Sequence, residues 1–190
     1  MIMSDEIKIE ATRERVFSAL NDLKILRQAI PGCERLERIS ETELTVTVQA
    51  KVGPVKARFQ GAVELSDINP PESYTISGKG KGGAAGFAEG TAQVTLRDED
   101  CYTILAYKVE ANVGGKLAQI GARLIAGTSK KLAREFFEAF ATLVQADTVT
   151  ASPATDVSAV SRDGRRLAWA AAGTLMVLAA VLLTIFGWPF

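Results

Sequence analysis

The chain has 190 residues, in which 22 lysines and arginines balance 22 aspartates and glutamates, and it contains no histidine. This balance, without a basic stripe of interleaved aromatic residues, argues against a nucleic-acid-binding protein. The lack of histidine removes the usual general base at neutral pH and the commonest metal ligand, and two cysteines are too few for a metal cluster, so no metal site is expected.

The first segments predict one strand followed by two short helices. Residues 2–11 end in an alternation of apolar and polar side chains, which is typical of a strand. Thr12 is predicted to cap one helix, and Asn21 or Asp22 is predicted to cap a second helix over residues 23–29.

A series of antiparallel strands is predicted next. Residues 44–52 and 55–65 alternate between apolar and polar side chains on either side of Gly53-Pro54, which predicts a β-hairpin with one buried face. Three further strands are predicted over residues 74–80, 88–96 and 102–113.

The last element of the folded domain is predicted to be a long helix. After a break at Gly114-Gly115, apolar residues recur at helical spacing from Leu117 to Val144 and predict a single helix of about 30 residues. The order of the elements predicts an α+β fold in which a curved antiparallel sheet wraps around this helix. We expect a cavity between the sheet and the helix.

Residues 78–90 contain six glycines and formally match the G-x-G-x-x-G dinucleotide-binding motif. The match is weak, because a strand rather than a helix is predicted to follow. Two interpretations stay open for this segment. It is either a mobile, tightly bent connection between strands, or a lip over the cavity in which Phe87 plugs the opening or contacts a ligand.

The C-terminal part of the sequence predicts a membrane anchor. No charged residue follows Arg166, and the apolar run 167–186 has about the 20 residues needed to span a bilayer. We therefore expect a domain over residues 1–145, a flexible linker over 146–164 and one transmembrane helix over 165–190. Arginines just before the apolar run, and an N-terminus without a signal peptide, predict a single-pass protein of the cytoplasmic membrane with its domain on the cytoplasmic side.

Four segments, in order along the chain, carry a resemblance to a known family. They are IPGCERL at 30–36, KVGPVKARFQG at 51–61, GKGKGGAAGFAEGTA at 78–92 and VGGKLAQIGARLI at 113–125. Together they resemble the CoxG-type family, named for the CoxG subunit of carbon monoxide dehydrogenase, within the START-like SRPBCC superfamily. The resemblance implies a helix-grip fold with an apolar cavity.

The resemblance also implies an accessory role beside a molybdenum-containing CO dehydrogenase. This protein would recruit the enzyme to the cytoplasmic membrane, or pass its electrons to membrane quinone. The molybdenum, flavin and iron–sulfur cofactors would belong to the partner enzyme, because this sequence lacks cysteine motifs for a cluster.

The first functional hypothesis is therefore a tethered carrier with no covalently bound cofactor. Its ligand would be menaquinone, ubiquinone or another prenyl lipid, and membrane lipid would be a further partner. Burying each carbon of a prenyl tail contributes about 0.8 kcal/mol, so an apolar cavity suffices for affinity. Ligand contacts are expected from residues predicted to face the cavity or to lie near the glycine segment, namely Phe59, Tyr74, Phe87, Ile120 and Leu124.

Two alternatives remain at this stage. The first is a pure scaffold, in which the domain docks the dehydrogenase and the cavity is incidental. The second is an enzyme acting on a hydrophobic ligand, for which Tyr74, Tyr102, Tyr107 or Glu89 would supply acid–base groups. We do not expect an enzyme, because the sequence shows no clear catalytic constellation.

Overall fold

A computed structural model describes residues 2–150 of the chain, with side chains to residue 146. The strands are β1 (Ile2–Ile9), β2 (Cys33–Arg38), β3 (Glu43–Val52), β4 (Val55–Asn69), β5 (Ser73–Lys81), β6 (Phe87–Glu99) and β7 (Tyr102–Gly114). The helices are α1 (Arg13–Ala19), α2 (Leu23–Ala29), α3 (Lys116–Ile120) and α4 (Ala122–Thr150), and a 3₁₀ turn, η1 (Gly83–Ala85), joins β5 to β6.

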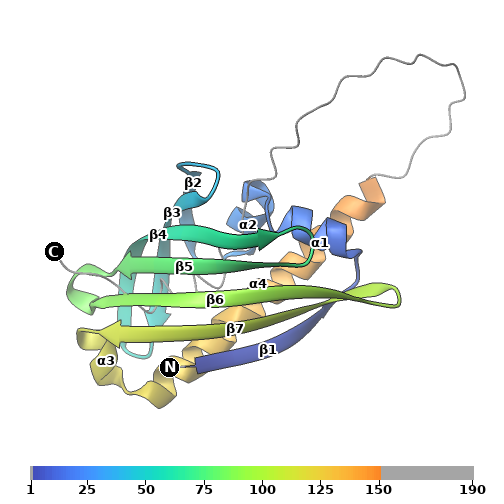
Figure 1. Ribbon diagram of the computed structural model, residues 1–190. Helices are drawn as coiled ribbons and strands as arrows, with labels where there is room; N and C mark the ends of the chain where they lie inside the picture. Colours follow the sequence, from blue (N-terminus) through green and yellow to red (C-terminus); the bar gives the residue numbers. More distant parts are fainter. Residues whose placement is uncertain (1, 151–190) are drawn as a thin grey trace, which may run out of the picture.

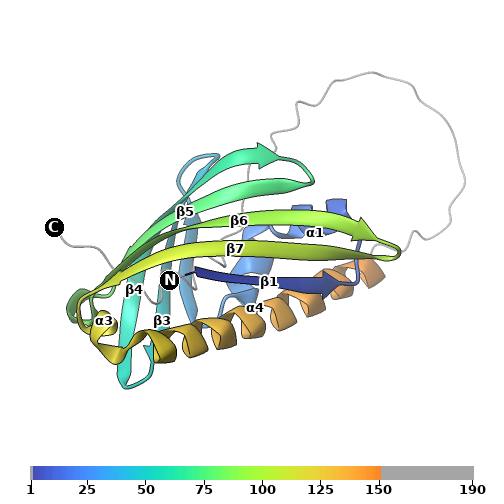
Figure 2. The same cartoon turned by 60° about the horizontal axis from the view of Figure 1, so that its bottom comes forward.

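The seven strands form one antiparallel sheet in the order β1-β7-β6-β5-β4-β3-β2. The sheet curves around α4, and α1 and α2 lie at the end of the sheet where β1 ends (Figure 1). Figure 2 shows α4 running along the concave side of the sheet. The expected α+β helix-grip fold is confirmed for the described residues.

Both predicted helix caps are present. The Thr12 hydroxyl accepts a hydrogen bond from the Arg15 amide at 3.3 Å, and the Asp22 carboxylate accepts one from the Lys24 amide at 2.7 Å. These bonds satisfy amides at the helix starts that have no partner within the helix. The caps therefore fix where α1 begins after β1 and where α2 begins after α1.

The core lies between the concave face of the sheet and one stripe of α4. The sheet contributes the alternate residues of each strand, such as Val46, Val48 and Phe59, and these are almost completely buried. Buried residues of α4 recur every three or four positions, so they form one face: Ile125, Ser129, Ala133, Phe136, Phe137, Phe140 and Val144. Burying a side chain such as Phe136 contributes about 1.5–3 kcal/mol.

The long helix differs from its prediction at its start. Gly121 has φ +96°, outside helical geometry, so it ends α3 and separates it from α4. The prediction of one continuous helix from Leu117 was therefore wrong at this point. Strand β2 was not predicted, because only Leu36 among its six residues is buried and the other side chains show no apolar alternation.

The described residues reach only part of the predicted C-terminal region. Helix α4 continues to Thr150, so the first residues of the expected linker over 146–164 are helical. The rest of that linker and the expected anchor over 165–190 lie outside the described residues. Within residues 2–150, no helix has the length and apolar character to cross a membrane.

Candidate functional site

A groove lies at the edge of the sheet, between β1, β7 and α4. Its volume is about 550 Å³, which falls in the range of small-molecule binding sites. Figure 2 shows β1 and α4 running along the same side of the molecule. The groove is lined by Asp5, Ile7, Lys8, Tyr107, Gly127, Lys130, Lys131, Arg134, Phe137, Glu138 and Ala141.

Helix α4 supplies one wall of the groove through its periodicity. Gly127, Lys131, Arg134, Glu138 and Ala141 follow one another at steps of three or four residues, so they share a stripe beside the buried face. A methyl group added at Gly127 would meet no atom within 4 Å. The groove is therefore open beside this glycine.

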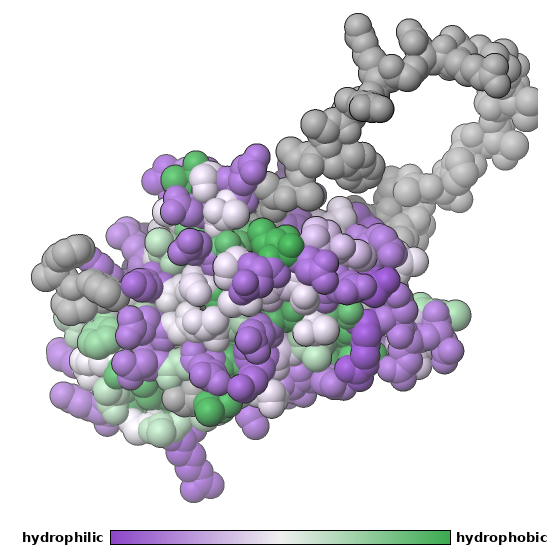
Figure 3. Space-filling model, in the orientation of Figure 1, coloured by the Kyte–Doolittle hydropathy of each residue, from purple (hydrophilic) through white to green (hydrophobic). Residues whose placement is uncertain are grey.

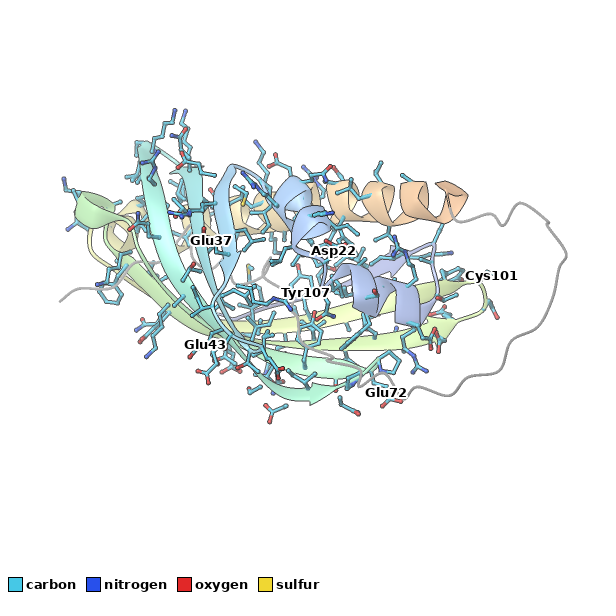
Figure 4. All side chains as sticks on the ribbon, turned by 90° about the horizontal axis from the view of Figure 1, so that it is seen from above. Asp22, Glu37, Glu43, Glu72, Cys101 and Tyr107 are labelled. Atoms are coloured by element: carbon cyan, nitrogen blue, oxygen red, sulfur yellow. The ribbon has the colours of Figure 1, made fainter. Side chains whose placement is uncertain are left out.

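Two aromatic rings form the inner part of the groove. The rings of Tyr107 and Phe137 stack with centroids 5.6 Å apart and planes 18° from parallel. Both side chains are largely buried, with 6% and 4% of their surface exposed. Figure 4 shows Tyr107 in the interior of the fold, whereas Glu43 and Glu72 point away from the sheet. The stacked pair therefore forms an aromatic inner wall of the groove.

The hydroxyl of Tyr107 is a proton donor at neutral pH. Asp5 lies directly across from Tyr107 in the β1–β7 pairing. Burial of the phenol, together with the negative charge of Asp5, raises the pKa of Tyr107 to about 12. The phenol therefore stays protonated and can donate a hydrogen bond to a carbonyl oxygen of a ligand.

The rim of the groove is charged and exposed. Arg134 Nε lies 3.8 Å from Glu138 Oε1, and Lys131 Nζ lies 3.6 Å from Glu135 Oε1. Exposed ion pairs of this kind contribute little, typically below about 1 kcal/mol. The cations can therefore turn toward a ligand at small cost. Within the described residues, no group of three or more histidine, cysteine or carboxylate side chains is placed to hold a metal ion.

The sequence profile of the family described as the CoxG subunit of carbon monoxide dehydrogenase matches residues 6–145. The chain belongs to this family. No functionally curated protein matches the chain.

The solved structures similar to this CoxG-family protein share its fold. A conserved protein from Geobacillus kaustophilus is 33% identical, with a TM-score of 0.74, over 77% of this chain and 97% of its own. A protein from Thermus thermophilus is 16% identical with a TM-score of 0.60, over 78% of this chain and 99% of its own. An aromatase/cyclase from Streptomyces sp. R1128 is 10% identical with a TM-score of 0.57, over 78% of this chain and 95% of its own.

Two of the five predicted ligand contacts of this CoxG-family protein face the concave side of the sheet. Phe59 is 1% exposed, and its ring lies so close to Gly82 that a Cβ there would be 2.3 Å from it. Tyr74 is also buried and meets Phe17 edge-to-face with ring centroids 5.9 Å apart. Its hydroxyl has no hydrogen-bond partner among the described residues, and burial raises the pKa of Tyr74 well above its ordinary value.

The other three predicted contacts lie elsewhere. Phe87 pairs with Gly114 in the sheet and shares the convex face with the exposed Lys81, so its ring does not point into the interior. Ile120 is half-buried against the β3–β4 turn, and Leu124 is 55% exposed. The five residues thus form no single site, and none of them lines the groove.

The glycine segment is a strand connection, and β6 follows it as predicted. It therefore lacks the helix that a dinucleotide-binding motif needs. Gly86 has φ +118°, and a Cβ on it would lie 2.2 Å from the carbonyl oxygen of Gly114. Close approach of the β5–β6 connection to the end of β7 accounts for this glycine.

The acid–base candidates are not brought together. Tyr74 and Tyr107 face the concave side, whereas Glu89 and Tyr102 alternate with buried residues and face the convex side. Lys8 lies over the Tyr102 ring, 3.2 Å from its centroid. This arrangement gives the enzyme alternative no shared constellation.

The sequence interpretation missed Phe137 and Gly127 as site residues, and it considered Tyr107 only as an acid–base group. The alternation of Thr103, Leu105 and Tyr107 was the available signal that Tyr107 faces inward. Which part of the helix lies beside β1 depends on tertiary packing, so sequence periodicity does not reveal the groove.

Proposed function

We propose that this CoxG-family protein is an accessory protein that binds a quinone in the groove between β1, β7 and α4. It would carry the quinone, menaquinone or ubiquinone, between the cytoplasmic membrane and a molybdenum CO dehydrogenase. The observation that carries this proposal is the groove of about 550 Å³ with the stacked Tyr107–Phe137 pair at its inner side. The dehydrogenase is named as the partner because the description of the family names it.

The chemistry of the groove suits a quinone head group. A quinone ring is flat and apolar on its faces, and it carries two carbonyl oxygens that only accept hydrogen bonds. The protonated phenol of Tyr107 can donate to one of them. Lys130 or Arg134 on the rim can donate to the other. A prenyl tail would lie on Ile7 and Ala141, gaining about 0.8 kcal/mol for each buried CH₂ group.

The sequence supports a location at the membrane. The uncharged stretch after Arg166 and the arginines before it favour an anchor that leaves the domain on the cytoplasmic side. A quinone with a long prenyl tail does not leave the bilayer unaided. A tethered domain with a binding groove would give the dehydrogenase access to it.

The first test identifies the ligand of the native protein. The full chain is purified from its own membranes in mild detergent, extracted with organic solvent and examined by mass spectrometry. We expect a quinone in amounts comparable to the protein. Absence of quinone, together with no binding of added short-chain menaquinone or ubiquinone, would contradict the proposal. An extract containing only phospholipid would assign the groove to lipid instead.

A second experiment separates carrier from scaffold. The variant Gly127→Leu extends a side chain into the open part of the groove, far from the convex face. Quinone reduction by the dehydrogenase on membranes is then measured beside recruitment of the enzyme to those membranes. A carrier loses quinone reduction while recruitment persists. A pure recruitment scaffold keeps both.

A further inference from the structure

The charge of the protein is strongly polarised although its net charge is zero. Three segments at one end of the fold, residues 51–56, 79–87 and 114–124, contain six cations and no carboxylate. Just beyond the second segment, Glu89 lies opposite Lys79 in the sheet. We call these three segments the basic end. Its cations are Lys51, Lys56, Lys79, Lys81, Lys116 and Arg123.

The fold brings these segments together. The β3–β4 turn, the β5–β6 connection and α3 lie at the same end of the sheet in both views (Figures 1 and 2). Gly53 of the turn lies against Ile120 of α3, since a Cβ on this glycine would be 3.4 Å from the Ile120 side chain. Gly86 lies against Gly114 and Gly115. The basic end is therefore one continuous surface.

Apolar residues are exposed among these cations. Leu124 is 55% exposed, and Pro54 and Ala84 are exposed as well. In Figure 3, this end of the molecule shows apolar and neutral residues interspersed with hydrophilic ones. Such a mixture is typical of surfaces that meet lipid headgroups, where apolar tips insert shallowly and cations stay at the headgroup level.

One pair of these cations is unfavourable in the free protein. Lys51 and Lys56 lie directly opposite each other in the β3–β4 pairing. Like charges at directly opposed positions destabilise a hairpin. An anionic surface brought against the turn would relieve this repulsion, so the pair points to a negatively charged partner.

The opposite end of the fold carries the opposite charge. Residues 10–15, 66–73 and 96–102 contain seven carboxylates and three arginines. An anionic surface would thus attract one end of the domain and repel the other. The charge distribution both binds such a surface and orients the domain on it.

We propose that the basic end docks on the anionic phospholipid headgroups of a bilayer. Its cations come from three separate segments of the chain rather than from one loop, which fits a fluid layer whose charges rearrange under each cation. The docking extends the proposed function, because Gly127 at one end of the groove lies only one helical turn from Leu124. Docking would bring that end of the groove toward the lipid, but it does not itself require a bound quinone.

The test uses the full chain in lipid nanodiscs. One set contains phosphatidylcholine alone, and the other contains about one part in four of anionic phosphatidylglycerol. A fluorophore is placed at Ala84→Cys in a chain with Cys33→Ser and Cys101→Ser. A second chain carries it at the native, exposed Cys101 of the acidic end, with Cys33→Ser. Energy transfer to a dye on the lipid headgroups reports which end lies on the bilayer.

We expect strong transfer from the Ala84→Cys probe in anionic discs only, and weak transfer from the Cys101 probe in both. Each cation near an anionic bilayer raises the partitioning of a protein onto that bilayer by roughly fivefold. The double variant Lys51→Glu, Lys56→Glu should therefore lower the docked fraction more than tenfold. High salt should release the domain in the same way. The control Lys24→Glu with Lys108→Glu changes the net charge equally at other sites and should leave docking intact.

Equal transfer from both probes, or transfer that does not depend on anionic lipid, would overturn the docking proposal. So would a Lys51→Glu, Lys56→Glu variant that keeps lipid contact but no longer binds the dehydrogenase, because the basic end would then serve the protein partner. Quinone binding is measured in the same variants. If the variants dock but bind no quinone, the proposed function is rejected while the docking proposal stands.

Discussion

The phenol of Tyr107 is the group on which the polar recognition of a ligand depends. Its pKa of about 12 means that the folded protein holds this proton more tightly than the unfolded chain, whose tyrosine titrates near pH 10. The resulting contribution to stability is complete below about pH 10 and is lost as the pH rises toward 12. We therefore predict that the protein loses stability across this window.

Asp5 provides a direct check of this account. The variant Asp5→Asn removes the negative charge across from Tyr107 but keeps the size of the side chain. The pKa of Tyr107 should fall part of the way back, because burial, the larger cause, remains. Ultraviolet absorbance of the phenolate, taken as the difference from Tyr107→Phe, measures this pKa. A pKa that does not move in Asp5→Asn would show that the carboxylate does not act on the phenol.

The contact between Gly82 and Phe59 gives a second prediction for single residues. Gly82→Ala would place a Cβ 2.3 Å from the ring of Phe59, which is 1% exposed. We expect this substitution to lower the free energy of unfolding by about 1–3 kcal/mol, measured by urea denaturation. In a Phe59→Leu background the same substitution should cost less. Additive effects of the two changes would contradict a direct contact.

At the scale of elements, two glycines of the C-terminal helical region should respond in opposite directions. Gly121 has φ +96°, and Gly127 is helical, while neither has an atom within 4 Å of an added Cβ. Gly121→Ala should destabilise by about 1–3 kcal/mol through backbone strain alone. Gly127→Ala should stabilise by up to about 1 kcal/mol, because alanine favours a helix.

Thermal unfolding of the full chain measures both changes under the same conditions. A higher melting temperature for Gly121→Ala would mean that α3 and α4 form one continuous helix, as the sequence pattern alone predicted. A lower melting temperature for Gly127→Ala would mean that this glycine serves a close contact.

Elements with strong periodicity could be predicted from the sequence, whereas their breaks and edges could not. The alternation around Gly53-Pro54 and the caps at Thr12 and Asp22 arise from local chemistry, and the structure confirms them. Strand β2 buries only Leu36 and is held in place by pairing with β3, which is a long-range effect. The break at Gly121 interrupts neither the apolar pattern nor the spacing of the helix, so the pattern does not show it.

The site was harder to predict than the fold for a physical reason. Phe59 and Tyr74 were expected at the concave side and lie there, but burial in the core does not distinguish a ligand contact from a packing contact. The groove depends on where α4 passes the edge strand β1. That position is set by the summed packing of helix and sheet, and no short segment of sequence encodes it.

For the whole molecule, the fold combines two surfaces with separate roles in the proposed mechanism. The groove between β1, β7 and α4 would hold the quinone, and the basic end would set the domain on the membrane. Gly127 lies close to both, at the end of the groove nearest Leu124. A quinone leaving the bilayer would therefore have a short path to the stacked rings of Tyr107 and Phe137.

The most direct test of the central claim compares quinone binding by two variants at one position. Gly127→Leu and Gly127→Ala both replace glycine by a good helix former, but only leucine extends a large side chain into the groove. Calorimetric titration of the detergent-solubilised full chain with a short-chain menaquinone measures the affinity. We predict wild-type-like binding for Gly127→Ala and at least about tenfold weaker binding for Gly127→Leu, a loss of about 1.4 kcal/mol or more. Equal affinities for a folded Gly127→Leu and Gly127→Ala would contradict the assignment of the groove as the quinone site.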